Sequence, residues 1–170
     1  MAGAKHLLTI EPLSAAAFHP FGDVIEVSDA ARHFSINDGY ARRYHDLANV
    51  EVVGVGARAM ISIFRAKPRV LPMRVHVLER HPLGSQAFMP LSALPYLVVV
   101  AEAGPEPVMA NIRCFRAASG QGVNYARGTW HHPLIALERT CDFLVIDRGG
   151  PASEANCDEF PLAAIDLHIA

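Results

Sequence analysis

Residues 74–88 read RVHVLERHPLGSQAF and combine a strand-like apolar pattern with a carboxylate and two histidines. Side chains alternate between the two faces of a β-strand. If this strand is unbroken, one face carries Val75, Val77, Glu79 and His81. This face begins with apolar side chains and ends in a carboxylate and an imidazole. The interior of a β-barrel has the same pattern where its apolar core borders a polar binding site. An ordinary polar strand end would show the same pattern.

The other face of this strand carries Arg74, His76, Leu78 and Arg80. Three of these four side chains are polar, so we expect this face to be the outer, solvated one. By parity, Glu79 and His81 are the pair that belongs to a site, and His76 is expected to point away from it.

Short apolar segments separated by turn residues continue in both directions from this stretch. Strand patterns fall at 24–27, 59–65, 73–79, 86–89, 96–101, 109–115, 123–125, 130–135 and 141–147. Twelve glycines and twelve prolines lie mostly between them. Many short strands with frequent turns predict an all-β sandwich or barrel. We expect one domain over residues 1–170, a short helix at 15–18 capped by Ser14, and a tail after residue 150 that wraps the outside.

Composition narrows the class of protein. The chain has 170 residues, 51% of them hydrophobic and 19% charged, with a net charge of −2. This balance of hydrophobic and charged residues excludes a disordered chain. The chain has no excess of basic residues to neutralise a phosphate backbone, so we expect no nucleic-acid partner. The longest strongly apolar run, 96–101, is far shorter than the roughly 20 residues of a membrane helix. With no signal peptide pattern and three cysteines, the sequence indicates a soluble, cytoplasmic protein with no membrane partner.

Residues 122–134, GVNYARGTWHHPL, form the second stretch with histidines. His131 and His132 are adjacent, so in a strand they point to opposite faces and at most one reaches a given interior. Adjacent histidines are often surface residues. Here the pair follows a tight turn at Arg127-Gly128, after which Trp130 resumes an apolar strand.

Together the two stretches resemble the paired motifs of the cupin superfamily. The first cupin motif, His-x-His followed by Glu, corresponds to Glu79-Arg80-His81 followed by Gln86. The second, Pro-x-Gly-x-x-His, corresponds to residues 126–131 and selects His131 over His132. Glu79 stands where the family has a histidine and Gln86 where it has a glutamate, so the usual cupin metal chemistry cannot be assumed. The resemblance implies a double-stranded β-helix, the jelly-roll barrel.

Nearly the whole chain resembles the ureidoglycolate lyase family. The matching segments are FHPFGDVIE (18–26), FSINDGYARRYHDLANV (34–50), ISIFRAKP (61–68), HVLERHPLGSQAFMPL (76–91), LVVVA (97–101), GQGVNYARGTWHHPL (120–134) and DFLVIDRGG (142–150). The resemblance implies a homodimeric cupin that converts ureidoglycolate to glyoxylate and urea in allantoin (purine) catabolism. It also implies a divalent metal, with nickel as the suspected ion.

The reaction can be matched to these side chains. Glu79, His81, Gln86 and His131 would give a divalent metal a set of nitrogen and oxygen ligands, and Glu79, His81 and His131 are also the candidate catalytic groups. Arginine binds a carboxylate bidentately, so the anionic substrate calls for one. The candidates are Arg43 as a catalytic residue and Arg65, Arg148 and Tyr44 as substrate-binding residues. A surface salt bridge is the alternative role of each arginine, and a loop cap or a dimer contact is equally open for Tyr44.

Two other functions fit the same pattern. One is hydrolysis of the same substrate to ammonia, carbon dioxide and glyoxylate, which would usually need a second metal or a strongly placed base. The other is a cupin that only binds a small ligand, although retention of Glu79, His81 and His131 favours an enzyme. The apolar excess, with a mean hydropathy of +0.20, leaves surface for an interface and agrees with a homodimer.

Overall fold

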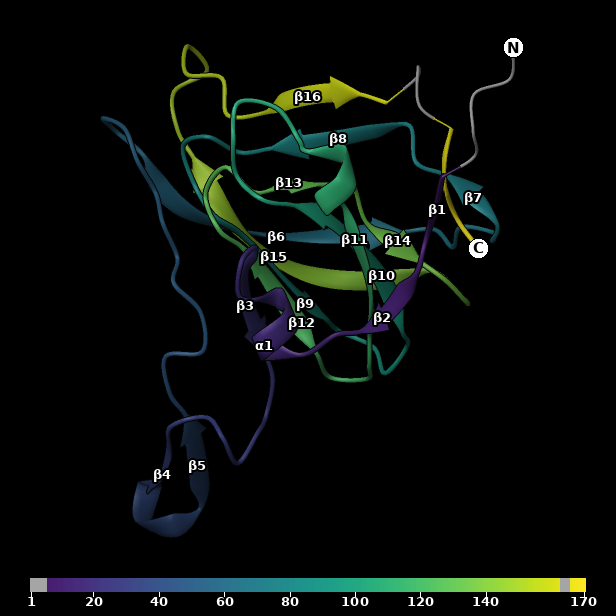
Figure 1. Ribbon diagram of the computed structural model, residues 1–170. Coiled ribbons are helices and arrows are strands. Elements are labelled where there is room, and N and C mark those ends of the chain that lie inside the picture. Colours follow the sequence, from purple (N-terminus) through teal and green to yellow (C-terminus); the bar gives the residue numbers. More distant parts are fainter. Residues whose placement is uncertain (1–5, 163–165) are drawn as a thin grey trace.

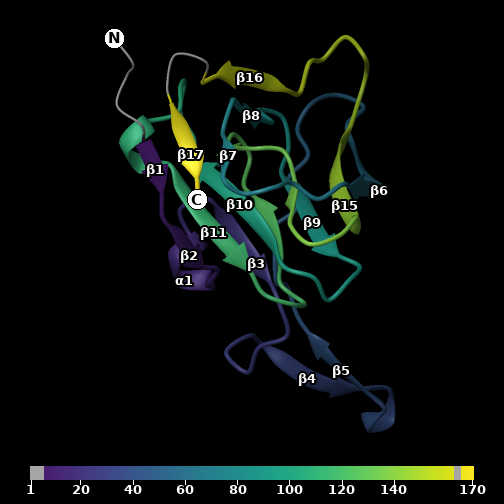
Figure 2. The same cartoon turned by 90° about the vertical axis from the view of Figure 1, so that its right-hand side faces the viewer.

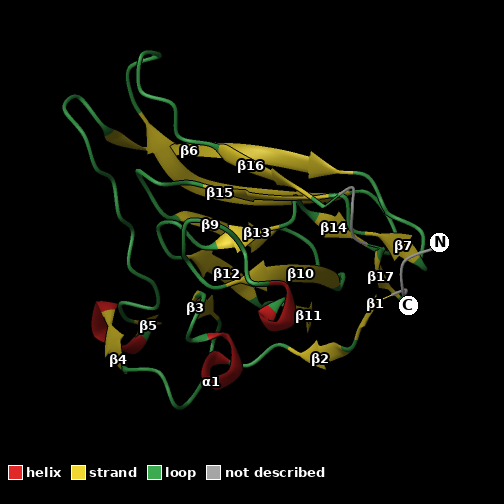
Figure 3. Cartoon of the chain, turned by 45° about the horizontal axis from the view of Figure 1, so that its top comes forward, coloured by secondary structure: helices red, strands yellow, loops and turns green. Residues whose placement is uncertain are grey.

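Two β-sheets lie face to face in the computed structural model, which describes residues 6–162 and 166–170 (Figures 1 and 3). The larger sheet contains β2 (Ile10–Pro12), β8 (Val77–Arg80), β10 (Tyr96–Ala101), β11 (Arg113–Ala117), β13 (Trp130–His131), β14 (Ile135–Ala136) and β16 (Asp158–Pro161). Their order is β16-β8-β13-β10-β11-β2, with β14 beside β10. The smaller sheet contains β3 (Gly22–Ile25), β6 (Arg58–Ala66), β9 (Gln86–Pro90), β12 (Gly122–Tyr125) and β15 (Cys141–Gly149), in the order β3-β12-β9-β15-β6.

Aromatic side chains fill the space between the sheets. Phe88, Phe115, Tyr125 and Phe143 are buried in one cluster. Along β15, Phe143 and Val145 are buried while Leu144 is half-buried, which is the alternation expected of a strand with one face in a core. The mainly β, cupin-type fold is therefore confirmed.

The short helix α1 (Ala15–Phe18) also agrees with the prediction. The Ser14 side chain accepts a hydrogen bond from the backbone N–H of Ala17 at 3.3 Å, so it caps the helix. Phe18 is fully buried and belongs to the core between the sheets. The described residues also form two 3₁₀ turns, η1 (Asn37–Gly39) and η2 (Met109–Asn111). No helix among the described residues is long and apolar enough to cross a membrane.

The outer face of the larger sheet is covered by a further layer, which corrects one expectation. A small sheet of β1 (His6–Leu8), β17 (Leu167–Ile169) and β7 (Met73–Arg74) shares a second apolar cluster with this face. Leu78 is 0% exposed in that cluster, together with Val75, so the expected solvated face is wrong for Leu78. The expected strand at 73–79 is broken between β7 and β8, so parity does not carry across residues 75 and 76.

A two-stranded hairpin of β4 (His33–Ile36) and β5 (Ala41–Tyr44) projects from the body of the molecule (Figures 1 and 2). Residues 45–57 return from it to β6. Along this return, the backbone N–H of Glu51 donates to Ser85 Oγ at 2.8 Å, which fixes the chain beside the start of β9.

Candidate active site

Glu79 and His131 face each other across two neighbouring strands. The register of β8 and β13 pairs these two residues, and Glu79 Oε1 lies 3.5 Å from His131 Nε2. His81 follows the end of β8, and its ring centre lies 5.2 Å from that of His131. One possible ligand atom from each of Glu79, His81 and His131 lies within 4.8 Å of the others. The structure thus brings together three of the residues selected from the sequence.

Local structure fixes the His131 ring. Gly128 has a φ of +82°, a left-handed conformation that suits glycine, and its N–H donates to the His81 carbonyl at 3.0 Å. This turn directs the chain into β13. The buried His131 ring then stacks on Tyr125 with ring centres 4.1 Å apart and planes 11° from parallel.

Hydrogen bonds place a proton on the Nδ1 atom of both histidines. His131 Nδ1 lies 3.0 Å from the Thr129 carbonyl, and His81 Nδ1 lies 2.6 Å from the Asn156 carbonyl. A carbonyl only accepts, so each Nδ1 carries a proton, and in the neutral ring of His131 the Nε2 presents a lone pair. The Nε2 of His131 is buried and finds no hydrogen-bond partner among the described residues.

The pKa values of the two facing groups are both lowered, for different reasons. Burial lowers the pKa of His131, so its ring is neutral near pH 7. Burial would raise the pKa of Glu79, but the contact with His131 and the neighbouring His81 outweigh it and leave this pKa below its usual value. The site therefore holds an ionised carboxylate beside a neutral imidazole.

Gln86 completes the cluster from the smaller sheet. It lies in β9, is buried, and its Oε1 is 3.1 Å from His81 Nε2. Its Nε2 donates to Asp147 Oδ2 at 3.4 Å. Asp147 follows the inward face of Phe143 and Val145 along β15, and it orients the amide so that the oxygen faces His81.

These atoms could hold a divalent cation. The cluster offers two imidazole nitrogens, a carboxylate and an amide oxygen, with no sulfur ligand. Metal-binding histidines almost always donate their other N–H to a carboxylate, a carbonyl or water, as His81 and His131 do here. The buried lone pair of His131, beside a carboxylate and without a donor, is the group that a cation would satisfy. Glu79 also belongs to a second set of possible metal ligands, together with the exposed residues Cys157 and Glu159.

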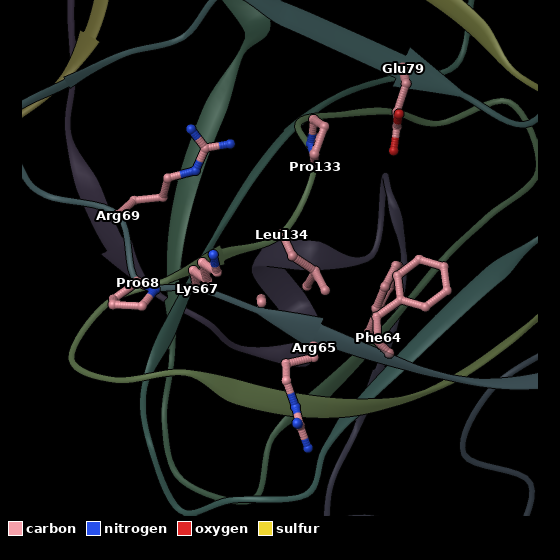
Figure 4. A pocket seen from close by; sticks show the side chains of 10 residues that line it. Phe64, Arg65, Lys67, Pro68, Arg69, Glu79, Pro133 and Leu134 are labelled. Atoms are coloured by element: carbon pink, nitrogen blue, oxygen red, sulfur yellow. The ribbon is translucent and has the colours of Figure 1, made fainter.

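A cavity of about 610 Å³ opens beside Glu79 (Figure 4). Its lining is Phe64, Arg65, Ala66, Lys67, Pro68, Arg69, Glu79, Phe88, Pro133 and Leu134. Sequence reasoning missed Lys67 and Arg69, which follow the end of β6. The two cations that flank Pro68 were the signal that could have identified this side of the cavity.

The arginines chosen from the sequence are placed differently. Arg65 lines the cavity rim, but it binds Asp142 bidentately, with Nε–Oδ1 at 2.8 Å and Nη2–Oδ2 at 2.9 Å, and Figure 4 shows it pointing away from Glu79. Arg148 is buried and donates to the Val53 carbonyl at 2.6 Å and to Glu154. Both arginines are held by partners outside the Glu79–His131 cluster.

Arg43 and Tyr44 lie in β5, on the projecting hairpin (Figure 2). Tyr44 packs against His33 of the opposite strand with ring centres 5.3 Å apart. The structure does not bring these two residues into the cavity of their own chain. Of the other histidines, His76 is exposed, and His132 is buried with its Nδ1 2.7 Å from the Pro133 carbonyl.

Two facing sheets, with two histidines, a glutamate and a glutamine gathered between their strands, define a cupin-type barrel with a polar site. A family model described as ureidoglycolate lyase matches residues 5–169. The chain belongs to the ureidoglycolate lyase family.

Relatives with that printed name cover most of the chain. A protein of Burkholderia cepacia is 52% identical over 157 residues, which are 92% of this chain and 86% of that protein. One of Stutzerimonas stutzeri is 53% identical over 153 residues, 90% of this chain and 88% of that protein. One of Pseudomonas entomophila is 54% identical over 152 residues, 89% of both chains. Each is named ureidoglycolate lyase.

Proposed function

We propose that this chain is a carbon–nitrogen lyase that converts ureidoglycolate to glyoxylate and urea in purine catabolism. The observation that carries the proposal is the group of Glu79, His81 and His131 beside an open cavity, in a chain of this family. The substrate carries a carboxylate, an α-hydroxyl and a ureido group on one carbon. Elimination removes the hydroxyl proton, breaks the C–N bond toward nitrogen and protonates the departing urea.

Glu79, His81, Gln86 and His131 are the residues that would hold a divalent cation, for which we propose nickel. When bound, such a cation lowers the pKa of the substrate hydroxyl and neutralises developing charge. The backbone carbonyls at Nδ1 hold both imidazoles in place, and Asp147 holds Gln86.

Proton movement can be assigned to Glu79. Its carboxylate is ionised and half-buried at the cavity, so it can accept the hydroxyl proton. As the C–N bond breaks, the same carboxylic acid can return the proton to the urea nitrogen. Proton and electrons then balance within the site, and neither water nor an oxidant is consumed.

The direct test of the reaction is product analysis. The purified chain is incubated with ureidoglycolate in a urease-free assay, and glyoxylate, urea and ammonia are measured separately. We expect urea to appear in step with glyoxylate, without ammonia. Stoichiometric ammonia would instead establish the hydrolase, and no product under any condition would leave a ligand-binding cupin.

We also propose that the protein is a homodimer whose interface lies on the outer face of the smaller sheet. The exposed fractions of Ile61 and Ile63 on β6 are 71% and 56%. The register places Ile146 and Leu144 of β15 beside them. Outer faces of antiparallel sheets are usually polar, and apolar patches of this kind mark interfaces.

The hairpin bearing Arg43 and Tyr44 fits the same assembly. An isolated two-stranded hairpin is marginally stable in water, so packing on a second copy would stabilise it. In such a dimer the hairpin would extend toward the partner subunit, where Arg43 could act at that subunit's site.

We propose that the protein lies in the cytoplasm. Its three cysteines, Cys114, Cys141 and Cys157, are free thiols, which fits a reducing compartment.

Light scattering after gel filtration tests the interface. We expect the mass of a dimer for the wild-type chain and of a monomer for Ile63→Lys. Val108→Lys is the matched control, because Val108 is similarly exposed, at 59%, but lies outside the two main sheets. A wild-type monomer at micromolar concentration, or a dimer that persists in Ile63→Lys, would refute the proposed interface.

A further inference from the structure

The cationic side of the cavity is built by the segment that leaves β6. Pro68 forms a parallel bridge with Ala136, and the Arg69 N–H donates to the Ala136 carbonyl at 2.8 Å. These backbone contacts tie residues 67–69 to β14 of the opposite sheet. The Cα positions of Lys67 and Arg69 are therefore held at the cavity, although both side chains are exposed.

Arg69 differs from the other arginines near the site in having its guanidinium available. Arg65 is engaged by Asp142, and Arg80 donates to Asp158 at 2.9 Å and stacks on Trp130. The side chains of Arg69 and Lys67 form no ion pair or hydrogen bond with any residue that the structure describes. An anionic ligand would be their first strong partner.

The position of this charge also fits the chemistry. In Figure 4, Arg69 and Lys67 lie on one side of the cavity and Glu79 on the other. A ligand in this cavity would therefore lie between the two cations and the Glu79 carboxylate.

We propose that Arg69 binds the substrate carboxylate, with Lys67 as a second cation, an inference that rests on the proposed lyase function. The planar guanidinium can donate two parallel N–H hydrogen bonds to the two carboxylate oxygens. With the carboxylate held there, the α-hydroxyl is directed toward Glu79 and the ureido group toward the remainder of the cavity. This arrangement selects small α-hydroxy acids bearing a ureido group over their uncharged amides.

Arg69→Gln tests the anchor, with Arg116→Gln as the matched control. Arg116 is an exposed residue of β11, and its replacement removes the same charge. A hydrogen bond to a charged group contributes about 1.5–3 kcal/mol, so we expect the KM of Arg69→Gln for ureidoglycolate to rise about 10- to 100-fold. Its kcat should change far less, Arg69→Lys should recover part of the loss, and Arg116→Gln should match the wild type.

Calorimetric binding of glyoxylate gives a readout that does not need turnover. We expect glyoxylate to bind the wild-type chain and Arg116→Gln alike, and to bind Arg69→Gln at least about 10-fold more weakly. If Arg69→Gln retains wild-type KM and glyoxylate affinity, the anchor is refuted even though urea is released. If no variant releases urea but glyoxylate binding still depends on Arg69, the anchor stands and the lyase proposal fails.

Discussion

Replacing His131 by Ala is expected to lower kcat for ureidoglycolate about 10²- to 10⁴-fold, the usual loss when an acid–base group or ligand is removed. The substitution removes the only buried imidazole lone pair that faces Glu79 in the described site. It also removes the stack on Tyr125. His131→Gln keeps more of the side-chain volume, and we expect a loss of kcat of the same order.

His132→Ala is the control for this loss. His132 is also buried, but its Nδ1 binds the Pro133 carbonyl and it lies outside the group formed by Glu79, His81 and His131. We expect its replacement to cost about 0.5–3 kcal/mol of stability and to leave most of the turnover. Thermal melts and kcat are measured for each variant. Equal losses of kcat in folded His131→Ala and His132→Ala would contradict the assigned roles.

Removal of divalent metal is expected to abolish urea release by the wild-type chain, and one divalent ion should restore it. A cation would satisfy both the ionised Glu79 carboxylate and the buried Nε2 of the neutral His131 ring, which has no other partner among the described residues. Among nickel, zinc, manganese and magnesium, we expect nickel to restore the most activity. Loss of most turnover on chelation is the second large effect that the site predicts.

Cation binding can be measured without turnover. The chelated chain is titrated with nickel by calorimetry, and bound metal is counted by elemental analysis. We expect one ion per wild-type chain and per His132→Ala chain, and much weaker binding by His81→Ala and His131→Ala. Activity that survives thorough chelation would contradict the proposed metal requirement and would leave Glu79 as a general base that acts without a cation.

Local patterning predicted the strands that lie in the middle of the main sheets. The apolar run at 96–101 is β10, buried along its whole length, and residues 86–89 lie within β9. The parity of Phe143, Val145 and Asp147 also holds, because β15 is long and has one face in the core. Burial by neighbouring strands follows the sequence period in such elements.

Elements that depend on distant partners could not be predicted in the same way. The burial of Leu78 requires the layer that includes Leu162 and β17, from the end of the chain. Residues 109–111 form η2 instead of a strand, and β4, β5 and β16 have weak patterns of their own. Their pairing with other segments stabilises them, and a local period does not contain that information.

The site shows the same division. Motif spacing selected Glu79, His81, Gln86 and His131, and β8, β13 and β9 place these four side chains together. The arginine that binds substrate was harder to predict, because the ion-pair partners of the candidates cannot be read from local sequence. Arg65 pairs with Asp142, which is distant along the chain, and Arg148 pairs with Glu154, which lies in a loop. A guanidinium that is free to bind substrate can be recognised only once its neighbours are known.

The measurement that tests the central claim most directly follows ureidoglycolate labelled with ¹³C at the ureido carbon by NMR. With the wild-type chain we predict that the label appears in urea, and that in His131→Ala the rate falls by about two orders of magnitude or more. The rate in His132→Ala should stay near that of the wild type. Label in bicarbonate, or full-rate urea formation by His131→Ala, would contradict the account.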